Sequence, residues 1–265
     1  MPATHQLAVT EHLPEGPGRK GPLVVLVHGS LDRASSFARV VRRLDDLHTV
    51  AYDRRGYDRS RVAPIHDTID GHIEDLLAVV DGRPAVVVGH SYGGVIALGA
   101  AVREGGNGSI LSLAAYEPPL PWLGFRRNPP PGSAGARADG EDPAEAAERF
   151  FRRMVGDSAW ERLPDKVKAE RRADGPALVA ELGAIRLDTP PFDPTELAIP
   201  AVFGRGGASL PHHRETVAWL VAHIPGSVMV EIPGAAHGAH LTHPDAFADF
   251  ARTALSRAGS PGVPG

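Results

Sequence analysis

The chain has 265 residues, of which 42% are hydrophobic and 23% are charged, and these proportions are typical of a folded globular protein. Its formal net charge of -4 provides no strongly basic field for nucleic acid or for an anionic membrane surface. Cysteine is absent, which excludes a disulfide framework, a thiolate metal site and a cysteine nucleophile.

The start of the chain shows no targeting signal. The stretch from Met1 to Thr10 has no basic patch followed by an apolar segment, and no apolar run approaches the roughly 18 residues of a spanning helix. We therefore expect a soluble, cytoplasmic protein with a small-molecule substrate and with no nucleic-acid or membrane partner. The oligomeric state stays open, with a homodimer as one alternative.

Short apolar, β-branched runs alternate with segments of helical periodicity. This alternation predicts an α/β fold with a mostly parallel, doubly wound sheet covered by helices on both faces. The expected strands are Leu23–Val27, Thr49–Tyr52, Pro84–Gly89, Ser109–Tyr116, Ile199–Gly204 and Ser227–Ile232. The expected helices are Ser35–Leu44, Asp67–Val80, Tyr92–Arg103, His212–His223 and Pro244–Ser256.

One block, residues 118–198, interrupts the alternation because it contains no convincing strand. It begins with a Pro-, Gly- and Arg-rich loop and continues with predicted short helices at Pro143–Val155, Ser158–Arg172 and Pro176–Leu187. We interpret the block as a helical cap inserted over the carboxyl edge of the sheet, where open α/β sheets bind ligands. Residues 1–117 and 199–258 then form the core, and residues 259–265 form a disordered tail.

The strongest chemical signal is the pattern G-x-S-x-G at residues 89–93, placed directly between an apolar strand and a helix. Such a turn strains the backbone of the serine and exposes its hydroxyl, and the flanking glycines avoid clashes in the tight turn. The amide-rich start of the following helix favours negative charge nearby. The alternative interpretation is an ordinary glycine-rich strand-to-helix turn.

With these motifs the sequence resembles the α/β-hydrolase family. The segments that carry the resemblance are 28–30 (HGS), 53–56 (DRRG) with Ser60, the turn at Ser91, and 234–237 (GAAH). The resemblance implies an α/β-hydrolase fold with Ser91 as the nucleophile and His237 as its base. It covers about residues 21–255 and says nothing about the insertion.

Other histidines near His237 have to be weighed. His240 and His243 lie at a spacing that could suggest a metal site, but no H-E-x-x-H pattern accompanies them. We interpret both as helix-start and surface residues, and we expect neither a metal nor a cofactor.

The orienting acid departs from the commoner family pattern. The loop after the strand Ile199–Gly204 reads GRGGASL and contains no acid, whereas Glu117 directly follows an earlier strand. Because some family members take the acid from that earlier position, we predict that Glu117 orients His237. The alternative is that Glu117 pairs with an arginine of the insertion. The fallback acids are Glu215, Asp193 and Asp188.

The same resemblance implies an oxyanion hole made by the backbone amides of Ser30 and Tyr92. Apolar residues near these positions are predicted to line the substrate pocket, although a helical apolar stripe is more often core packing. The predicted pocket residues are Leu31, Trp122, Phe125, Phe151 and Met154.

Taken together, these residues predict a serine hydrolase that cleaves a small, largely apolar carboxylic ester or a lactone through an acyl-enzyme. An alternative keeps the fold and the Ser/His pair but uses them in a cofactor-free lyase, a thioesterase or another tailoring enzyme. A further alternative is a receptor that keeps the pocket and only binds.

Overall fold

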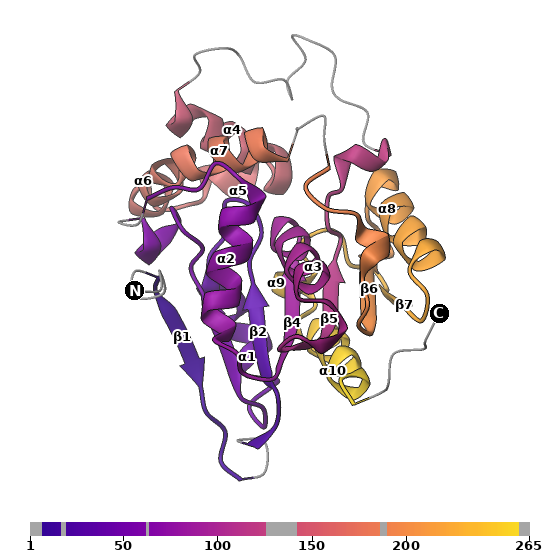
Figure 1. Ribbon diagram of the computed structural model, residues 1–265. Coiled ribbons are helices and arrows are strands. Elements are labelled where there is room, and N and C mark those ends of the chain that lie inside the picture. Colours follow the sequence, from indigo (N-terminus) through magenta and orange to yellow (C-terminus); the bar gives the residue numbers. More distant parts are fainter. Residues whose placement is uncertain (1–6, 17–19, 62–63, 126–141, 186–189, 260–265) are drawn as a thin grey trace.

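The computed structural model describes residues 7–16, 20–61, 64–125, 142–185 and 190–259 (Figure 1). Its centre is a seven-stranded sheet in the order β1-β3-β2-β4-β5-β6-β7. All neighbouring strands run parallel except β1, which pairs antiparallel with β3. The strands are β1 Val9–His12, β2 Leu23–Val27, β3 Thr49–Tyr52, β4 Ala85–His90, β5 Ile110–Tyr116, β6 Ala201–Gly206 and β7 Val228–Ile232.

The predicted mostly parallel sheet is confirmed, and strand β1 is an addition. Strand β1 has no apolar run that would have marked it in the sequence, and three of its four residues are exposed in the structure. It forms at the edge of the sheet through pairing with β3.

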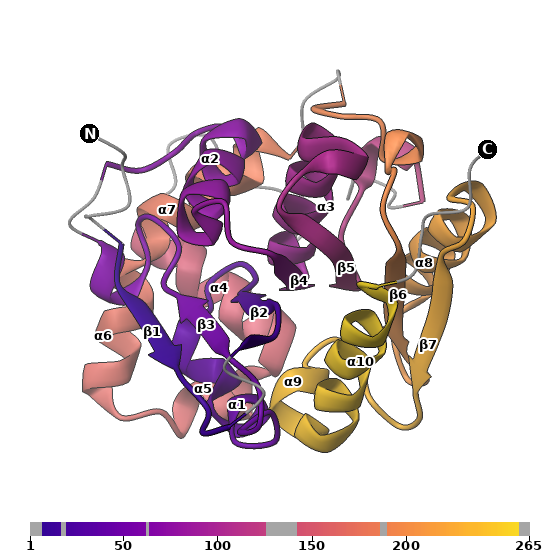
Figure 2. The same ribbon diagram turned by 60° about the horizontal axis from the view of Figure 1, so that its bottom comes forward.

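Helices pack on both faces of the sheet. The helices outside the cap are α1 Ala38–Val41, α2 Ile69–Val80, α3 Tyr92–Glu104, α8 Pro211–His223, α9 Ala239–Thr242 and α10 Pro244–Arg257. Figure 2 shows α2 and α3 on one side of the sheet and α1 and α10 on the other. The predicted helix at Ser35–Leu44 is shorter than expected, because its first part, Ala34–Phe37, is a 3₁₀ turn.

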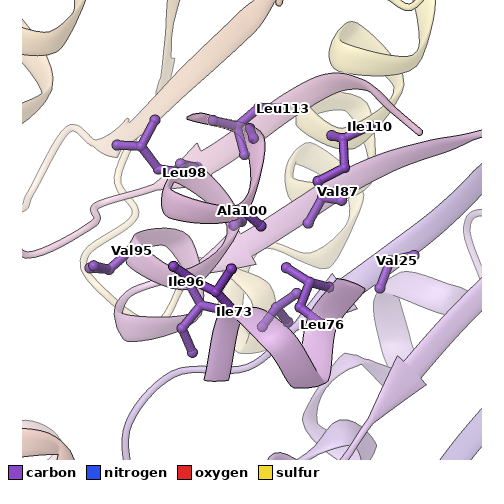
Figure 3. Packing of buried hydrophobic residues seen from close by; sticks show 14 of the residues in the cluster. Val25, Ile73, Leu76, Val87, Val95, Ile96, Leu98, Ala100, Ile110 and Leu113 are labelled. Carbon is purple, nitrogen blue, oxygen red and sulfur yellow. The ribbon is translucent and has the colours of Figure 1, made fainter. Parts of the chain in front are cut away.

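The alternation of side chains along each strand divides the core into two layers. Val25 and Val87 pack with Ile73 and Ile96 of α2 and α3 (Figure 3). Val86 and its neighbours on the opposite face pack against α1 and α10. Strands buried on both faces read as continuous apolar runs, which is why the sequence marked them clearly.

The described part of the insertion is helical and contains no strand among residues 118–125, 142–185 and 190–198. Its helices are α4 Pro143–Val155, α5 Asp157–Glu161, α6 Asp165–Ala173 and α7 Gly175–Ala184, and they group at one end of the sheet (Figure 1). The predicted helix at Ser158–Arg172 is divided into α5 and α6 at Pro164, because the residue before a proline disfavours helical geometry. The division of the chain into core and cap stays a prediction, and most of the predicted disordered tail lies outside the described residues.

Among the described residues, no helix is both long enough and apolar enough to cross a lipid bilayer.

A buried ion pair joins helix α7 to the loop after β3. Arg54, in that loop, donates to Glu181 of α7 at 2.9 Å, and both side chains are at most 1% exposed. The same guanidinium donates to the carbonyl oxygens of His28 and Gly29. Burial alone would lower the pKa of Arg54, but the Glu181 carboxylate holds that pKa above its ordinary value. Arg54 therefore ties the loop after β2 to helix α7.

We expect Glu181→Leu to lower the free energy of unfolding by about 3 kcal/mol, because it leaves the Arg54 charge buried without its counter-charge. Urea unfolding measures this difference. The matched control is Asp245→Asn, which removes the partner of Arg43 in an exposed pair and should barely move the urea midpoint. Equal shifts in the two variants would contradict the assignment of Arg54 and Glu181 as a structural link.

Candidate active site

Ser91 occupies a strained turn between β4 and α3. Its backbone has φ 54° and ψ -124°, a conformation that residues with a side chain rarely adopt. An added Cβ at Gly93 would lie 2.2 Å from the Val27 carbonyl oxygen, and one at Gly89 would lie 2.3 Å from the Gly93 carbonyl oxygen. Glycine is therefore required on both sides of Ser91, as the pattern in the sequence indicates.

The structure brings Ser91, His237 and Glu117 into one hydrogen-bonded chain. His237 lies in the loop between β7 and α9, and its Nε2 is 2.9 Å from Ser91 Oγ. Its Nδ1 is 2.7 Å from Oε2 of Glu117, which directly follows β5. With Nδ1–H donated to the carboxylate, Nε2 is left to accept the serine proton.

The surroundings of Glu117 hold it as a buried carboxylate. Oε1 accepts hydrogen bonds from the backbone N–H of Gly206 at 2.8 Å and from the hydroxyl of Ser209. Burial alone would raise the pKa of Glu117, but the hydrogen bond and charge of His237 outweigh it and hold that pKa below its ordinary value. The described partners of Glu117 are thus residues of the site rather than an arginine of the insertion.

The position that faces His237 Nδ1 is taken by Glu117 and not by a fallback acid. Glu215 lines the same cavity as Ser91 and His237, and Asp193 caps a 3₁₀ turn by accepting from the N–H of Thr195. Asp188 lies outside the described residues.

A second imidazole, which the sequence analysis did not single out, lies beside His237. The ring of His213, on α8, stacks on the His237 ring at 4.5 Å with an angle of 16° between the planes. Its Nδ1 is 3.9 Å from the same Glu117 oxygen. Ser209 and His213 could not be found from a motif, because both reach Glu117 from a different part of the chain.

The loop after β2 presses against the nucleophile. An added Cβ at Gly29 would lie 2.9 Å from Ser91 Cβ, and the next residue, Ser30, lines the same cavity as Ser91 and Tyr92. Burial lowers the pKa of His28 to about 3, so its ring is neutral at pH 7. His28 Nδ1 donates to the Gly29 carbonyl oxygen and Nε2 accepts from the Arg54 N–H, which fixes the loop from inside.

A buried cluster behind the site contradicts the interpretation of His240 as a surface residue. His240 is only 2% exposed, because its ring packs at 4.1 Å against that of His90, the last residue of β4. His90 Nε2 donates to the His237 carbonyl oxygen at 2.7 Å, and His240 Nε2 donates to Asp32 Oδ2 at 3.2 Å. The helix-start position of His243 is confirmed, since it precedes Pro244 at the start of α10.

Two groups of side chains bring potential metal-ligand atoms within 4.8 Å of one another: Asp32, His90 and His240 in one, and Glu117, His213 and His237 in the other. Nε2 of His90, Nε2 of His240 and both ring nitrogens of His237 are hydrogen-bonded to protein atoms, whereas the Nδ1 atoms of His90 and His240 are buried with no hydrogen-bond partner among the described residues.

Two connected arms of a cleft meet at Ser91. They share Ser30, Ser91, Phe150, Met154 and His237. The large arm has a volume of about 630 Å³ and the small arm about 250 Å³. The large arm is further lined by Tyr92, Pro119, Phe125, Arg153, Leu182, Ile185, Leu210, Pro211, His212, His213 and Glu215. The small arm is further lined by Leu31, Asp32, His90, Phe151, Val155, Arg171, Gly238, His240 and Leu241.

Four of the five predicted pocket residues therefore line the cleft, and one does not. Phe125 lines the large arm, Leu31 and Phe151 line the small arm, and Met154 lines both. Trp122 lies outside both arms, because its ring packs edge-on against Phe192 in a separate surface pocket. The sequence showed that Trp122 is apolar but could not show which way the turn after β5 directs it.

Comparisons with known proteins show which family the chain resembles. The chain is 28% identical over 240 residues to a pimeloyl-acyl-carrier protein methyl ester esterase of Chromobacterium violaceum, covering 86% of this chain and 92% of that protein. It is 32% identical over 143 residues to the lipase LipV of Mycobacterium tuberculosis, covering 53% of this chain and 52% of the lipase. The uncharacterized hydrolase YraK of Bacillus subtilis is matched over 33% of its length, so the chain spans only a third to about half of YraK and LipV.

Among solved structures, the enol-lactonase from Burkholderia xenovorans LB400 is similar in fold, with a TM-score of 0.72 and 23% sequence identity. The similarity covers 96% of this chain and 98% of that one. The model of the Alpha/beta hydrolase family matches residues 24–250, which include Ser91, Glu117 and His237. The chain therefore belongs to the alpha/beta hydrolase family.

Proposed function

We propose that this protein is a serine hydrolase that cleaves a carboxylic ester or a lactone through an acyl-enzyme. The observation that carries the proposal is the hydrogen-bonded chain from Glu117 through His237 to Ser91, with distances of 2.7 and 2.9 Å. A serine hydroxyl is a weak nucleophile that needs such a base within reach. Ser91 also lies where the two arms of the cleft meet, so a bound ester would have space on both sides of its carbonyl.

The proposed reaction assigns roles to the residues of this hydrogen-bonded chain and to two backbone amides. Ser91 Oγ attacks the carbonyl carbon while His237 Nε2 takes the hydroxyl proton, and the imidazolium passes that proton to the leaving alcohol oxygen. Glu117 stays ionised and stabilises the imidazolium. The backbone N–H groups of Ser30 and Tyr92 donate to the oxyanion of the tetrahedral intermediate. Water then attacks the acyl carbon while His237 takes its proton, and the imidazolium returns that proton to Ser91 Oγ as the bond to the acyl group breaks and the carboxylic acid leaves.

The lining of the cleft supports a largely apolar substrate, because most of the wall near Ser91 is aliphatic or aromatic. Phe150 and Met154 of α4 border both arms, and Leu182 and Ile185 close the large arm. The names of the relatives point the same way, since they include a methyl ester esterase and a lipase. A thioesterase would use the same residues, and the substrate panel below separates it from an oxygen-ester hydrolase.

A fluorophosphonate probe should label the wild-type protein at Ser91, because only an activated serine attacks phosphorus readily. Ser91→Ala should remove the label and lower kcat/KM on p-nitrophenyl esters by about 10⁴-fold or more. The labelled peptide is identified by mass spectrometry, and a matched panel of thioesters and lactones is assayed in parallel. Labelling that persists in Ser91→Ala would contradict the proposed nucleophile.

Glu117→Gln should lower kcat by about 10³- to 10⁴-fold, because an amide N–H facing His237 Nδ1 favours the wrong tautomer. Steady-state kinetics on a p-nitrophenyl ester measures the change. The control Asp193→Asn removes a carboxylate that lies in a turn away from the cleft and should retain wild-type turnover. A full wild-type rate in Glu117→Gln would assign the orienting role to another group.

Glu117 should also affect stability in a pH-dependent way. Since its pKa in the folded protein lies below the ordinary value of 4.5, the carboxylate contributes stability that is complete above that value. This contribution is lost as the pH falls through the lower, folded-state pKa. The difference in unfolding free energy between wild type and Glu117→Gln should therefore stay constant from about pH 7 to pH 5 and shrink in stronger acid. Urea unfolding across this range tests it, and a difference that grows in acid would contradict the assignment.

A further inference from the structure

The small arm of the cleft is lined by charged as well as apolar side chains. Leu31, Phe151 and Leu241 are among its apolar lining residues, whereas Asp32 and Arg171 are its charged ones. A carboxylate facing a confined, largely apolar space is costly to desolvate, so its presence in a substrate cleft calls for a partner.

Asp32 is held rigidly by one of its two oxygens. Oδ2 accepts hydrogen bonds from His240 Nε2 at 3.2 Å and from Ser36 Oγ at 3.0 Å. His240 is itself fixed by packing against His90, Phe37 and Phe247. Among the described residues, no hydrogen-bond donor meets the other oxygen, Oδ1. The side chain is 15% exposed, which leaves that carboxylate in contact with the arm.

The charged lining residues of the small arm restrict what can bind there. Burial alone would raise the pKa of Asp32, but the hydrogen bond from His240 outweighs it and holds that pKa far below the ordinary range, so the group is a carboxylate. Arg171 lines the same arm, and its Nη1 donates to the Leu31 carbonyl oxygen. A carboxylate and a guanidinium that line one small cavity disfavour a ligand group with a net charge of either sign. A hydroxyl matches both, because it donates one hydrogen bond and accepts another.

We propose that Asp32 is a specificity-determining residue, and that the substrate is an ester whose smaller half carries a hydroxyl that donates to Asp32 Oδ1. This inference rests on the proposed serine hydrolase, since it names the substrate class of that site. The apolar sides of the arm then hold the carbon chain between the hydroxyl and the scissile carbonyl. A substrate with a methyl in place of the hydroxyl leaves Oδ1 of this carboxylate desolvated and without a donor.

The test uses two pairs of esters that differ only by a hydroxyl in place of a methyl. In the acyl half the pair is p-nitrophenyl β-hydroxybutyrate and p-nitrophenyl isovalerate, and in the alcohol half it is glycol monobutyrate and propyl butyrate. In at least one pair, wild-type kcat/KM should be about 10- to 100-fold higher for the hydroxyl member, as expected for a hydrogen bond to a buried charge. The pair that responds also identifies which half of the ester occupies the small arm. A preference for the methyl member in both pairs overturns the proposal.

Asp32→Asn provides the matched variant. The amide oxygen takes over the hydrogen bonds from His240 and Ser36, so the amide N–H₂ turns toward the arm and replaces an acceptor with donors. The preference for the hydroxyl member should fall by about tenfold or more. Asp193→Asn, which makes the same change at a carboxylate in a turn away from the cleft, should keep the wild-type ratio. Equal ratios in wild type and Asp32→Asn overturn the proposal.

A binding measurement separates this inference from the proposed function. In Ser91→Ala, calorimetry with the unreacted esters should show tighter binding of the hydroxyl member, with the preference lost in Ser91→Ala/Asp32→Asn.

A binding preference without fluorophosphonate labelling of the wild type would contradict the hydrolase and leave Asp32 as a binding residue. Labelling without any hydroxyl preference would leave the hydrolase and reject the role of Asp32. A preference abolished by EDTA and restored by a divalent cation would assign Asp32, His90 and His240 to a metal instead, and would also overturn the proposal.

Discussion

The rest of the site depends on the hydrogen bonds that the carboxylate of Glu117 accepts. Its two oxygens join three parts of the chain, because they accept hydrogen bonds from Gly206 at the end of β6, from Ser209 in the following loop and from His237 after β7. The backbone holds Glu117 at the same edge, since its N–H donates to the Gly204 carbonyl oxygen. A neutral or displaced side chain at this position would release the imidazole that faces Ser91.

The fold holds several residues at the carboxyl edge of the sheet in strained backbone conformations. Leu31, Asp58, Ser91 and Glu117 have positive φ and follow β2, β3, β4 and β5 at the carboxyl edge of the sheet. Each such backbone is costly, and it persists because the surrounding structure over-determines it. Two of the contacts that hold these backbones in place are the hydrogen bond from the Ser91 N–H to the Tyr116 carbonyl oxygen and the buried ion pair of Arg54 with Glu181. The strain thus exposes the serine hydroxyl without loosening the sheet.

Two distant parts of the chain line the cleft. Helix α4 supplies Phe150 and Met154, which border both arms, while the loop after β2 supplies Asp32, which lines the small arm. Apolar walls favour binding in proportion to the area they bury and distinguish poorly between similar chains. A single fixed carboxylate in such a wall distinguishes a hydroxyl from a methyl, because the penalty for leaving it unpaired is large.

The sequence by itself determined the buried strands and the turn at Ser91, because both depend on local patterns in or beside an apolar run. Its resemblance to the α/β-hydrolase family indicated His237, and the absence of an acid from GRGGASL, together with the earlier acid position of some family members, indicated Glu117. The tertiary structure alone decided the contacts of His213, Ser209, Asp32 and His240, the direction of Trp122 and the pairing of β1. These depend on which side chains from distant segments meet across loops, and no periodicity along one segment records that geometry. The interpretation of His240 as a surface residue is wrong for the same reason, since rings that pack against it, His90 of β4 among them, come from distant segments of the chain.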